Sequence, residues 1–273
     1  MPRAIRLLAI GENGTGKTGA LIALARAGYN LYILDFDNGT EIIENMLREE
    51  PTTLARFHIT KLRDKVVPVN GIPKIKPPLV AYKGAGKALV DWNADAFTSS
   101  DILVIDTLTK MSEAAFNEAL LLGGRLNQRP QLQDYGWMAD SIKLFIDMIT
   151  ADEFPAHVIV NTHIQYLGGD DETMVASRGL PNAKGKEISK TVATCFNTVL
   201  LFRSKGTGPA TRRVISTQPQ GVVEVKSSNP LGVKAEYPIE SGLADIFRDI
   251  LGSTPAKGLA PTAPQAEPQQ QEA

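Results

Sequence analysis

The sequence predicts an α/β protein with a mainly parallel sheet flanked by helices, on the evidence of three observations. Five apolar runs that resemble buried strands alternate with helical segments along the chain. These runs lack polar alternate positions, so helices must cover both faces of the sheet. The first run leads into a glycine-rich loop, and a helical pattern follows that loop directly. The predicted strands are residues 5–10, 31–34, 102–105, 158–161 and 199–202.

The first loop, Gly11 to Thr18, fits the P-loop pattern G-x-x-x-x-G-K-[ST] in full. In this pattern successive backbone N–H groups surround the α- and β-phosphates of a nucleotide, the lysine reaches the β- and γ-phosphates, and the hydroxyl ligates Mg²⁺. An ordinary glycine-rich turn is the alternative, which the strand before it and the helix after it disfavour. We therefore predict ATP and Mg²⁺ as ligands of Gly11, Glu12, Asn13, Gly14, Thr15, Gly16, Lys17 and Thr18.

The later segments complete the predicted domain. An amphipathic helix over 135–150 places Met138, Ile142 and Ile146 on one stripe. Segments 213–217 and 222–225 predict a C-terminal antiparallel hairpin around Pro219-Gln220-Gly221, and a short helix follows near 243–251. Residues 1–251 are thus expected to form one ATPase domain. Residues 252–273, rich in Pro, Ala, Gln and Glu, are expected to form a disordered tail.

Composition restricts the class of protein. The chain has 273 residues, 43% of them hydrophobic, and a net charge of −1, which suits a globular protein without a generally basic surface. It contains no apolar run of membrane-spanning length and no signal-peptide pattern, so a cytoplasmic location is expected, in the host if the chain is phage-encoded. Cys195 is the single cysteine, which excludes an intramolecular disulfide and predicts a small buried residue.

Two irregular stretches interrupt the alternation of strands and helices. Residues 65–87 carry four prolines among valines and lysines, and predict either an extended hairpin or a mobile loop. Residues 167–186 follow a core strand, are rich in Gly, Asp and Lys, and predict a second mobile loop.

An acidic residue at the end of an apolar strand is the second element that a P-loop requires. The run Ile102 to Ile105 ends in Asp106, which is typical of the Walker B carboxylate that helps to hold Mg²⁺. A helix-capping role is the alternative, because a helical segment follows Thr107. With the P-loop present we favour Thr18 and Asp106 as the metal-binding pair.

Two further strand ends carry groups suited to hydrolysis. Asp35 and Asp37 follow the second strand on one face, and Asp37, farther along, is our candidate to orient or deprotonate the attacking water. Asp35 is expected to support it, although both acids could simply cap the next helix. Thr162 and His163 follow the fourth strand and are candidate sensors of the γ-phosphate, with a structural role for the histidine as the alternative.

In this order of motifs the chain resembles the RecA superfamily of ATPases. The matching features are the P-loop, the Asp35-x-Asp37 strand end, Asp106-Thr107, and Asn161-Thr162-His163 before a long glycine-containing loop. Within the superfamily it is most similar to phage-encoded RecA-like ATPases of single-strand annealing and recombination. That narrower match rests on residues 133–136, 180–186 and 225–226. The resemblance spans roughly residues 4–250 and implies a RecA-like P-loop NTPase core.

The resemblance also implies roles for individual residues. Asp37 matches the catalytic glutamate and His163 the glutamine that couples nucleotide state to the DNA-binding loop, and both depart from the residues of that family. Aspartate is one methylene shorter than glutamate, so slow turnover is expected. Lys226 matches the first basic residue of a segment that reaches a neighbouring subunit's ATP site, while Ser228 replaces the second. A homo-oligomer, ring or filament, is implied if Lys226 acts in this way; a solvated lysine on an edge strand is the alternative.

Single-stranded DNA is the partner that the resemblance implies. Residues 167–186 would be the mobile DNA-binding loop, with Arg178, Lys184 and Lys186 contacting phosphates, although Asp170, Asp171 and Glu172 offset their charge. The segment 56–87 has eight basic residues against Asp64 alone. From it we predict Lys74, Lys76 and Lys83 as phosphate contacts, with Tyr82 and Trp92 available to stack on bases. A solvated basic hairpin is the alternative.

We therefore expect an ATPase that acts on single-stranded DNA in recombination or strand annealing, in phage replication. Lys17, Asp37, Asp106, His163 and Lys226 are its candidate catalytic residues. A nucleotide-gated assembly or loader module, a helicase-like motor, and a small-molecule kinase are the alternatives, the last disfavoured because no arginine-rich lid follows Asp106. A single-strand-binding protein could also recruit the tail.

Overall fold

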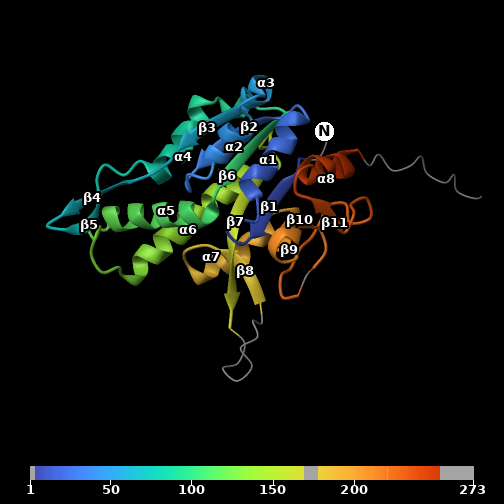
Figure 1. The fold of residues 1–273 in the computed structure, drawn as a ribbon. Helices are drawn as coiled ribbons and strands as arrows, with labels where there is room; N and C mark the ends of the chain where they lie inside the picture. Colours follow the sequence, from blue (N-terminus) through green and yellow to red (C-terminus); the bar gives the residue numbers. More distant parts are fainter. Residues whose placement is uncertain (1–3, 169–177, 220, 253–273) are drawn as a thin grey trace, which may run out of the picture.

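A mainly parallel sheet forms the centre of the computed structural model, which describes residues 4–168, 178–219 and 221–252 (Figure 1). Six strands run parallel in the spatial order β3-β2-β6-β7-β1-β9. Their bounds are β1 (Arg6–Gly11), β2 (Asn30–Asp35), β3 (Phe57–Lys61), β6 (Asp101–Asp106), β7 (His157–Leu167) and β9 (Thr198–Lys205). Every residue of β1 and β6 is buried, as expected for strands covered on both faces. The predicted fold class is thus confirmed.

Helices cover the two faces of the sheet and create two apolar cores. One core joins the sheet to α1 (Lys17–Arg26), α2 (Glu41–Met46), α3 (Pro51–Leu54) and α8 (Gly242–Leu251). The other joins it to α4 (Ala81–Asp91), α5 (Leu108–Leu122), α6 (Leu132–Thr150) and α7 (Lys186–Thr191). The stripe predicted on α6 is buried at Met138, Ile142 and Ile146. Short 3₁₀ turns occupy Ala94–Ala96, Val192–Cys195 and Gly208–Ala210.

The C-terminal antiparallel strands lie beyond β9. Strand β10 (Arg212–Ser216) pairs with β9 on one side and with β11 (Glu236–Pro238) on the other, so an antiparallel hairpin is present. The pairing predicted between 213–217 and 222–225 is wrong. Val223 instead makes an isolated bridge to Gly179 in β8, and Lys226 makes one to Val199 near the amino end of β9.

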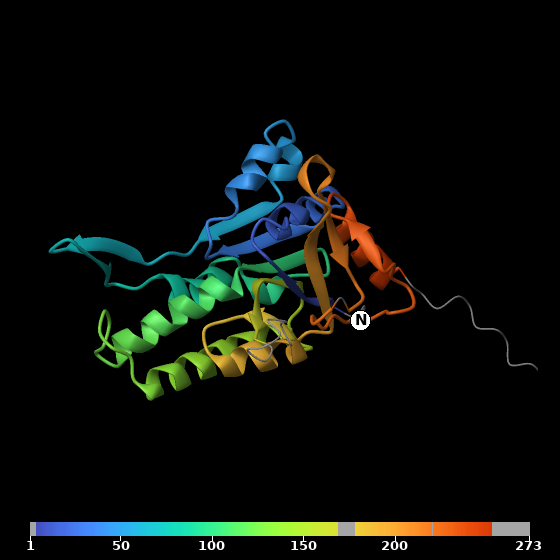
Figure 2. The same ribbon diagram turned by 60° about the horizontal axis from the view of Figure 1, so that its bottom comes forward.

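The proline-rich stretch 65–87 divides into a hairpin and a helix. Strands β4 (Lys65–Val69) and β5 (Ile72–Lys76) pair around Asn70 and Gly71, whose positive φ angles of 52° and 78° suit a tight two-residue turn. The hairpin stands away from the main sheet, beside the loop that joins α5 to α6 (Figures 1 and 2). The Asn127 side chain holds it there by bonding the Ile75 amide and carbonyl at 2.8 and 2.9 Å. The hairpin alternative is therefore confirmed for 65–76, while Lys83 and Lys87 belong to α4.

Strand β7 continues past the sheet and pairs there with β8 (Arg178–Asn182), forming a two-stranded arm. The predicted mobile loop of 167–186 thus includes an ordered stem, while the acids at 170–172 and the predicted tail from 253 onward lie outside the described residues. Within the described part of the chain, no helix has the length and apolar character needed to cross a membrane.

Candidate active site

The P-loop connects β1 to α1 through backbone conformations that require glycine. Gly14 and Gly16 have φ angles of 74° and 92°, in the left-handed region. At Gly11 a Cβ atom would lie 2.5 Å from the Phe202 carbonyl oxygen, so no side chain fits there. Helix α1 begins at Lys17, and its free N–H groups and dipole make this end a site for anions.

Lys17 is the buried cation of this loop. Its Nζ donates hydrogen bonds to the carbonyl oxygens of Gly11 and Glu12 at 2.8 and 2.9 Å. Burial lowers the pKa of Lys17 to about 8, and the negative charges of Asp106, Asp37 and Glu12 oppose that shift. The ammonium is thus held at the loop among acids, and the Lys17 side chain is buried.

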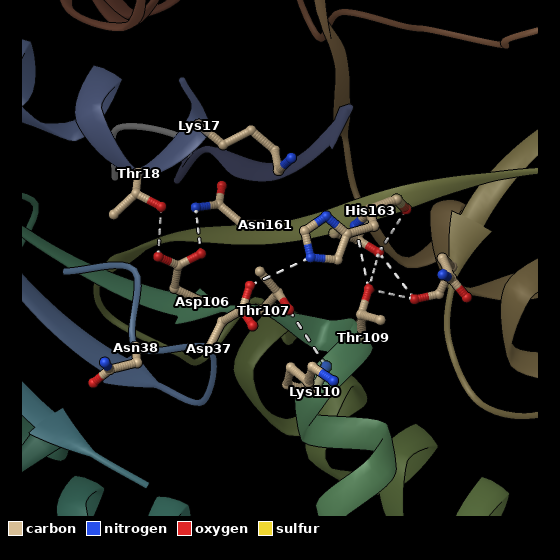
Figure 3. Close-up of polar contacts among 12 residues, drawn as sticks. Lys17, Thr18, Asp37, Asn38, Asp106, Thr107, Thr109, Lys110, Asn161 and His163 are labelled. Carbon is tan, nitrogen blue, oxygen red and sulfur yellow. Dashed lines mark hydrogen bonds and ion pairs between the residues drawn. The ribbon is translucent and has the colours of Figure 1, made fainter. Parts of the chain in front are cut away.

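Asp106 and Thr18 meet at the metal position that the sequence predicts. The Thr18 hydroxyl donates to Asp106 Oδ2 at 2.7 Å, and Asn161 Nδ2 donates to the other carboxylate oxygen at 3.1 Å (Figure 3). Burial raises the pKa of Asp106, while these two hydrogen bonds lower it. Sequence reasoning missed Asn161 as a site residue, although its strand end lies directly beside that of Asp106 in the sheet.

Asp37 and His163 form a second pair at the same edge of the sheet. His163 Nε2 lies 3.3 Å from Asp37 Oδ2, and the two side chains are 19% and 31% exposed. Burial lowers the pKa of His163, with smaller contributions from Lys17 and Lys110, while Asp37 acts in the opposite direction. A neutral imidazole can then donate from Nε2 to the Asp37 carboxylate. Its Nδ1 is buried without a hydrogen-bond partner among the described residues.

Asp35 supports the turn that carries Asp37. Its Oδ1 accepts hydrogen bonds from the backbone N–H groups of Asp37 and Asn38, at 3.1 and 2.6 Å. Its Oδ2 accepts one from the Thr40 hydroxyl at 2.6 Å. The side chain is fully buried. This geometry matches the supporting role predicted for Asp35.

Thr162, the other candidate sensor, faces away from the phosphate loop. Its hydroxyl lies 3.4 Å from that of Thr109 and donates to the Asn182 carbonyl at 3.3 Å. Thr109 donates to the same carbonyl at 2.6 Å and accepts from the His163 backbone N–H at 3.2 Å. This cluster connects α5 and β7 to β8, so it links the site to the base of the two-stranded arm.

A cavity of about 250 Å³ collects these groups. The P-loop forms one wall, and Asp37, Asp106 and His163 form another. Ile42 of α2 and Arg213 of β10 also line it. Sequence reasoning missed both, because each comes from a segment without a motif.

Lys226 lies outside this cavity. Its backbone N–H and C=O pair with Val199 at 3.1 and 2.7 Å, and its exposed side chain lines a separate cavity of about 340 Å³ with Arg178 and Lys190. Within one chain, therefore, the structure does not bring Lys226 to Lys17.

The predicted nucleic-acid contacts do not form one cluster. Lys74 and Lys76 are exposed on the hairpin, whereas Lys83 forms an ion pair of 2.6 Å with Glu118 on α5. Lys186 is exposed at the start of α7, Lys184 Nζ lies 4.4 Å above the Phe116 ring, and Arg178 lies 3.4 Å from Glu224.

The two aromatic residues predicted to stack on bases are engaged within the protein. Tyr82 is half-buried and donates to the Ser141 carbonyl at 2.8 Å. Trp92 packs against the core and lies edge-on to Tyr32, with 5.4 Å between ring centroids. The structure therefore disfavours that prediction, because both rings are partly buried against the protein.

The fold and the site define an AAA-type P-loop ATPase domain. A family model described as "AAA domain" matches residues 3–228, and the chain belongs to this family. No curated protein matches the sequence.

Solved structures with a similar fold include a KaiC-like protein from Pyrococcus horikoshii OT3, with 12% identity, a TM-score of 0.45, and coverage of 87% of this chain and 86% of that one. A flagellar accessory protein, FlaH, from Methanocaldococcus jannaschii has 10% identity, a TM-score of 0.42, and coverage of 86% and 84%. An ATPase from the type III secretion system of pathogenic bacteria has 16% identity, a TM-score of 0.46, and coverage of 74% of this chain and 52% of that one.

Proposed function

We propose that this chain binds and hydrolyses ATP with Mg²⁺ and acts on single-stranded DNA in recombination or strand annealing, in the cytoplasm of a phage-infected host. The observation that carries the ATPase part is the convergence of Lys17 and two pairs of side chains on one cavity. Lys17 lies at the phosphate loop, Thr18 bonds Asp106, and His163 contacts Asp37.

The residues at the predicted metal position fit Mg²⁺. Their donors are a hydroxyl and a carboxylate oxygen only 2.7 Å apart, both hard oxygen ligands of the kind that magnesium prefers. Thr18 and Asp106 would hold the ion, and Asn161 keeps the carboxylate oriented toward Thr18. When bound, the ion neutralises charge on the phosphate oxygens.

Asp37 is the group we assign to the attacking water. Its carboxylate is partly exposed to the cavity, and a neutral His163 can hold it by donating from Nε2. Asp37 would then accept the proton of the water as the water attacks the γ-phosphorus, while the bond from that phosphorus to the β–γ bridging oxygen breaks and ADP leaves. His163 therefore acts as a positioning residue, and Lys17 balances charge on the β- and γ-phosphates.

The hairpin is the part of the structure that best supports DNA binding. Lys65 lies opposite Lys76, and Val67 lies opposite Lys74, so the three lysines share one face of the two strands. All three are exposed, and none has an acidic partner among the described residues. A phosphate backbone is the ligand that suits such a face.

One experiment tests this function. The ATPase rate and the oligomeric mass of the full chain are measured with and without single-stranded DNA, at low and at high salt. We expect modest turnover, an oligomer, and DNA binding that weakens steeply with salt. Turnover without any DNA binding at low salt would remove the DNA part of the proposal and retain the ATPase part.

A nucleotide-gated assembly module is the second candidate, favoured by the position of Lys226. Because this lysine lies away from the P-loop of its own chain, any ATP site that it completes must belong to a neighbouring subunit. In that case ATP would change the oligomeric mass, and DNA would have no effect on mass or turnover.

A further inference from the structure

Arg213 lies against the phosphate loop although no motif includes it. Strand β10 places it beside Ile239, whose backbone N–H donates to the Arg213 carbonyl at 3.2 Å. A Cβ atom on Gly16 would lie 3.1 Å from Ile239 Cγ1 and 3.3 Å from Arg213 Cδ. The arginine stem therefore packs directly on the backbone of the loop at Gly16, the residue that caps α1.

The guanidinium of Arg213 has no charged partner among the described residues. It is exposed and has neither an ion pair nor a hydrogen bond to another residue in the described ranges. Arg203, on the adjacent strand, shows the contrast, because it donates to Glu236 at 3.1 Å. Arg213 also lines the same cavity as Lys17 and Thr18. Its charge is thus available to an anion held by the loop.

The order of the strands decides which part of a nucleotide this arginine can reach. Asp37 follows β2, Asp106 ends β6 and His163 lies within β7, and all three strands are on one side of β1. Strand β10 lies on the other side of β1, beyond β9. Arg213 therefore approaches the loop from the side opposite to the groups that we assign to the γ-phosphate.

We propose that Arg213 binds the α- and β-phosphates of the nucleotide from within the same chain, as a second cation that works with Lys17. A guanidinium forms charge-assisted hydrogen bonds with phosphate oxygens, often two at once. Because ATP and ADP share these two phosphates, Arg213 strengthens the binding of both to the same degree. This inference rests on the proposed binding of a nucleotide at the P-loop.

The test uses calorimetric titration of the full chain with Mg-ATP and with Mg-ADP. For Arg213→Gln we expect the Kd of both nucleotides to rise about tenfold, equivalent to about 1.4 kcal/mol. Arg213→Lys should lie between, because it keeps the charge but loses the paired donors. Arg212→Gln is the matched control, because the Arg212 side chain points to the opposite face of β10 from Arg213 and does not line the cavity. Its Kd values should stay within about twofold of those of the unmodified chain.

The melting temperature without nucleotide serves as the check on folding, and it should be the same for Arg213→Gln and Arg212→Gln. Unchanged affinity in Arg213→Gln, with tight binding by the unmodified chain, would overturn the inference and leave the P-loop assignment standing. Weaker binding of ATP alone would also overturn it, since the arginine would then contact the γ-phosphate. Failure of the unmodified chain to bind either nucleotide would instead refute the proposed function.

Discussion

The substitution Asp37→Asn separates nucleotide binding from hydrolysis. Asparagine has the same shape as aspartate but cannot accept a proton from water at neutral pH. Within the described part of the chain, the hydrogen-bond partner of the Asp37 side chain is His163 at 3.3 Å, and the amide oxygen of asparagine can accept that same hydrogen bond. Since Asp37 is partly exposed, the substitution should cost less than about 1 kcal/mol of folding stability.

The expected loss of turnover is much larger than the loss of stability. Removing a general base typically lowers a rate by about 10²- to 10⁴-fold, equivalent to about 3 to 5 kcal/mol of activation free energy. The Kd for Mg-ATP should stay within about threefold, because Asp37 contacts neither Lys17 nor Thr18 through a hydrogen bond. Steady-state ATPase assays give the rate, and calorimetry gives the Kd.

Asp35→Asn is the matched control, two residues away. Asp35 is fully buried and accepts three hydrogen bonds, so losing one acceptor oxygen should destabilise the fold by about 1 to 3 kcal/mol. Its melting temperature should therefore fall, whereas that of Asp37→Asn should not. Undiminished turnover in Asp37→Asn would refute the role of Asp37 in the reaction.

Three further predictions concern DNA binding, pH and assembly. Lys74→Gln with Lys76→Gln should weaken single-stranded DNA binding. Titrations at several salt concentrations should also show a shallower slope of log K against log[salt], by the amount expected for about two lost phosphate contacts. An unchanged slope would show that these lysines do not contact the DNA. Burial, and to a lesser extent Arg6, lowers the pKa of His157 to about 4 from 6.5, so the unfolded chain binds the extra proton more readily. Stability should fall as the pH drops from 6.5 to 4, by up to about 3 kcal/mol, and denaturant titrations of His157→Gln should show a shallower fall; equal falls would contradict this. If Lys226 acts across a subunit interface, mixing Lys17→Ala with Lys226→Ala subunits should restore ATPase activity that neither variant has alone, because some interfaces then combine an intact Lys17 with an intact Lys226. A mixture as inactive as its components would show that Lys226 does not act at a neighbouring ATP site.

Sequence patterns predicted the parts of the fold that depend on local chemistry. Buried parallel strands need continuous apolar runs, so β1, β6 and β7 were evident from the sequence. Strand β3 has a mixed pattern, because it lies at the edge of the sheet with one neighbour, and it was missed. The partner of β10 was also missed, since a strand's own residues do not specify which of two nearby segments will pair with it.

The site residues that belong to local motifs were likewise predicted from the sequence, and those that depend on tertiary packing were missed. Lys17, Thr18 and Asp106 belong to motifs, and the structure brings them together with Asp37 and His163. Asn161 and Arg213 reach the site only through strand register and through the packing of β10 on the P-loop, neither of which a pattern encodes. The roles of Lys226 and of the lysines on the hairpin remain predictions, because both depend on molecules outside a single chain.

The central claim is that a magnesium-bound triphosphate sits in the loop between β1 and α1, held by Lys17. The most direct test is calorimetry of Mg-ATP binding to the unmodified chain and to Lys17→Ala. We predict saturable binding to one site per chain, and at least a hundredfold weaker affinity in the variant, about 2.7 kcal/mol. No heat of binding with the unmodified chain, or equal affinity in Lys17→Ala, would contradict the account.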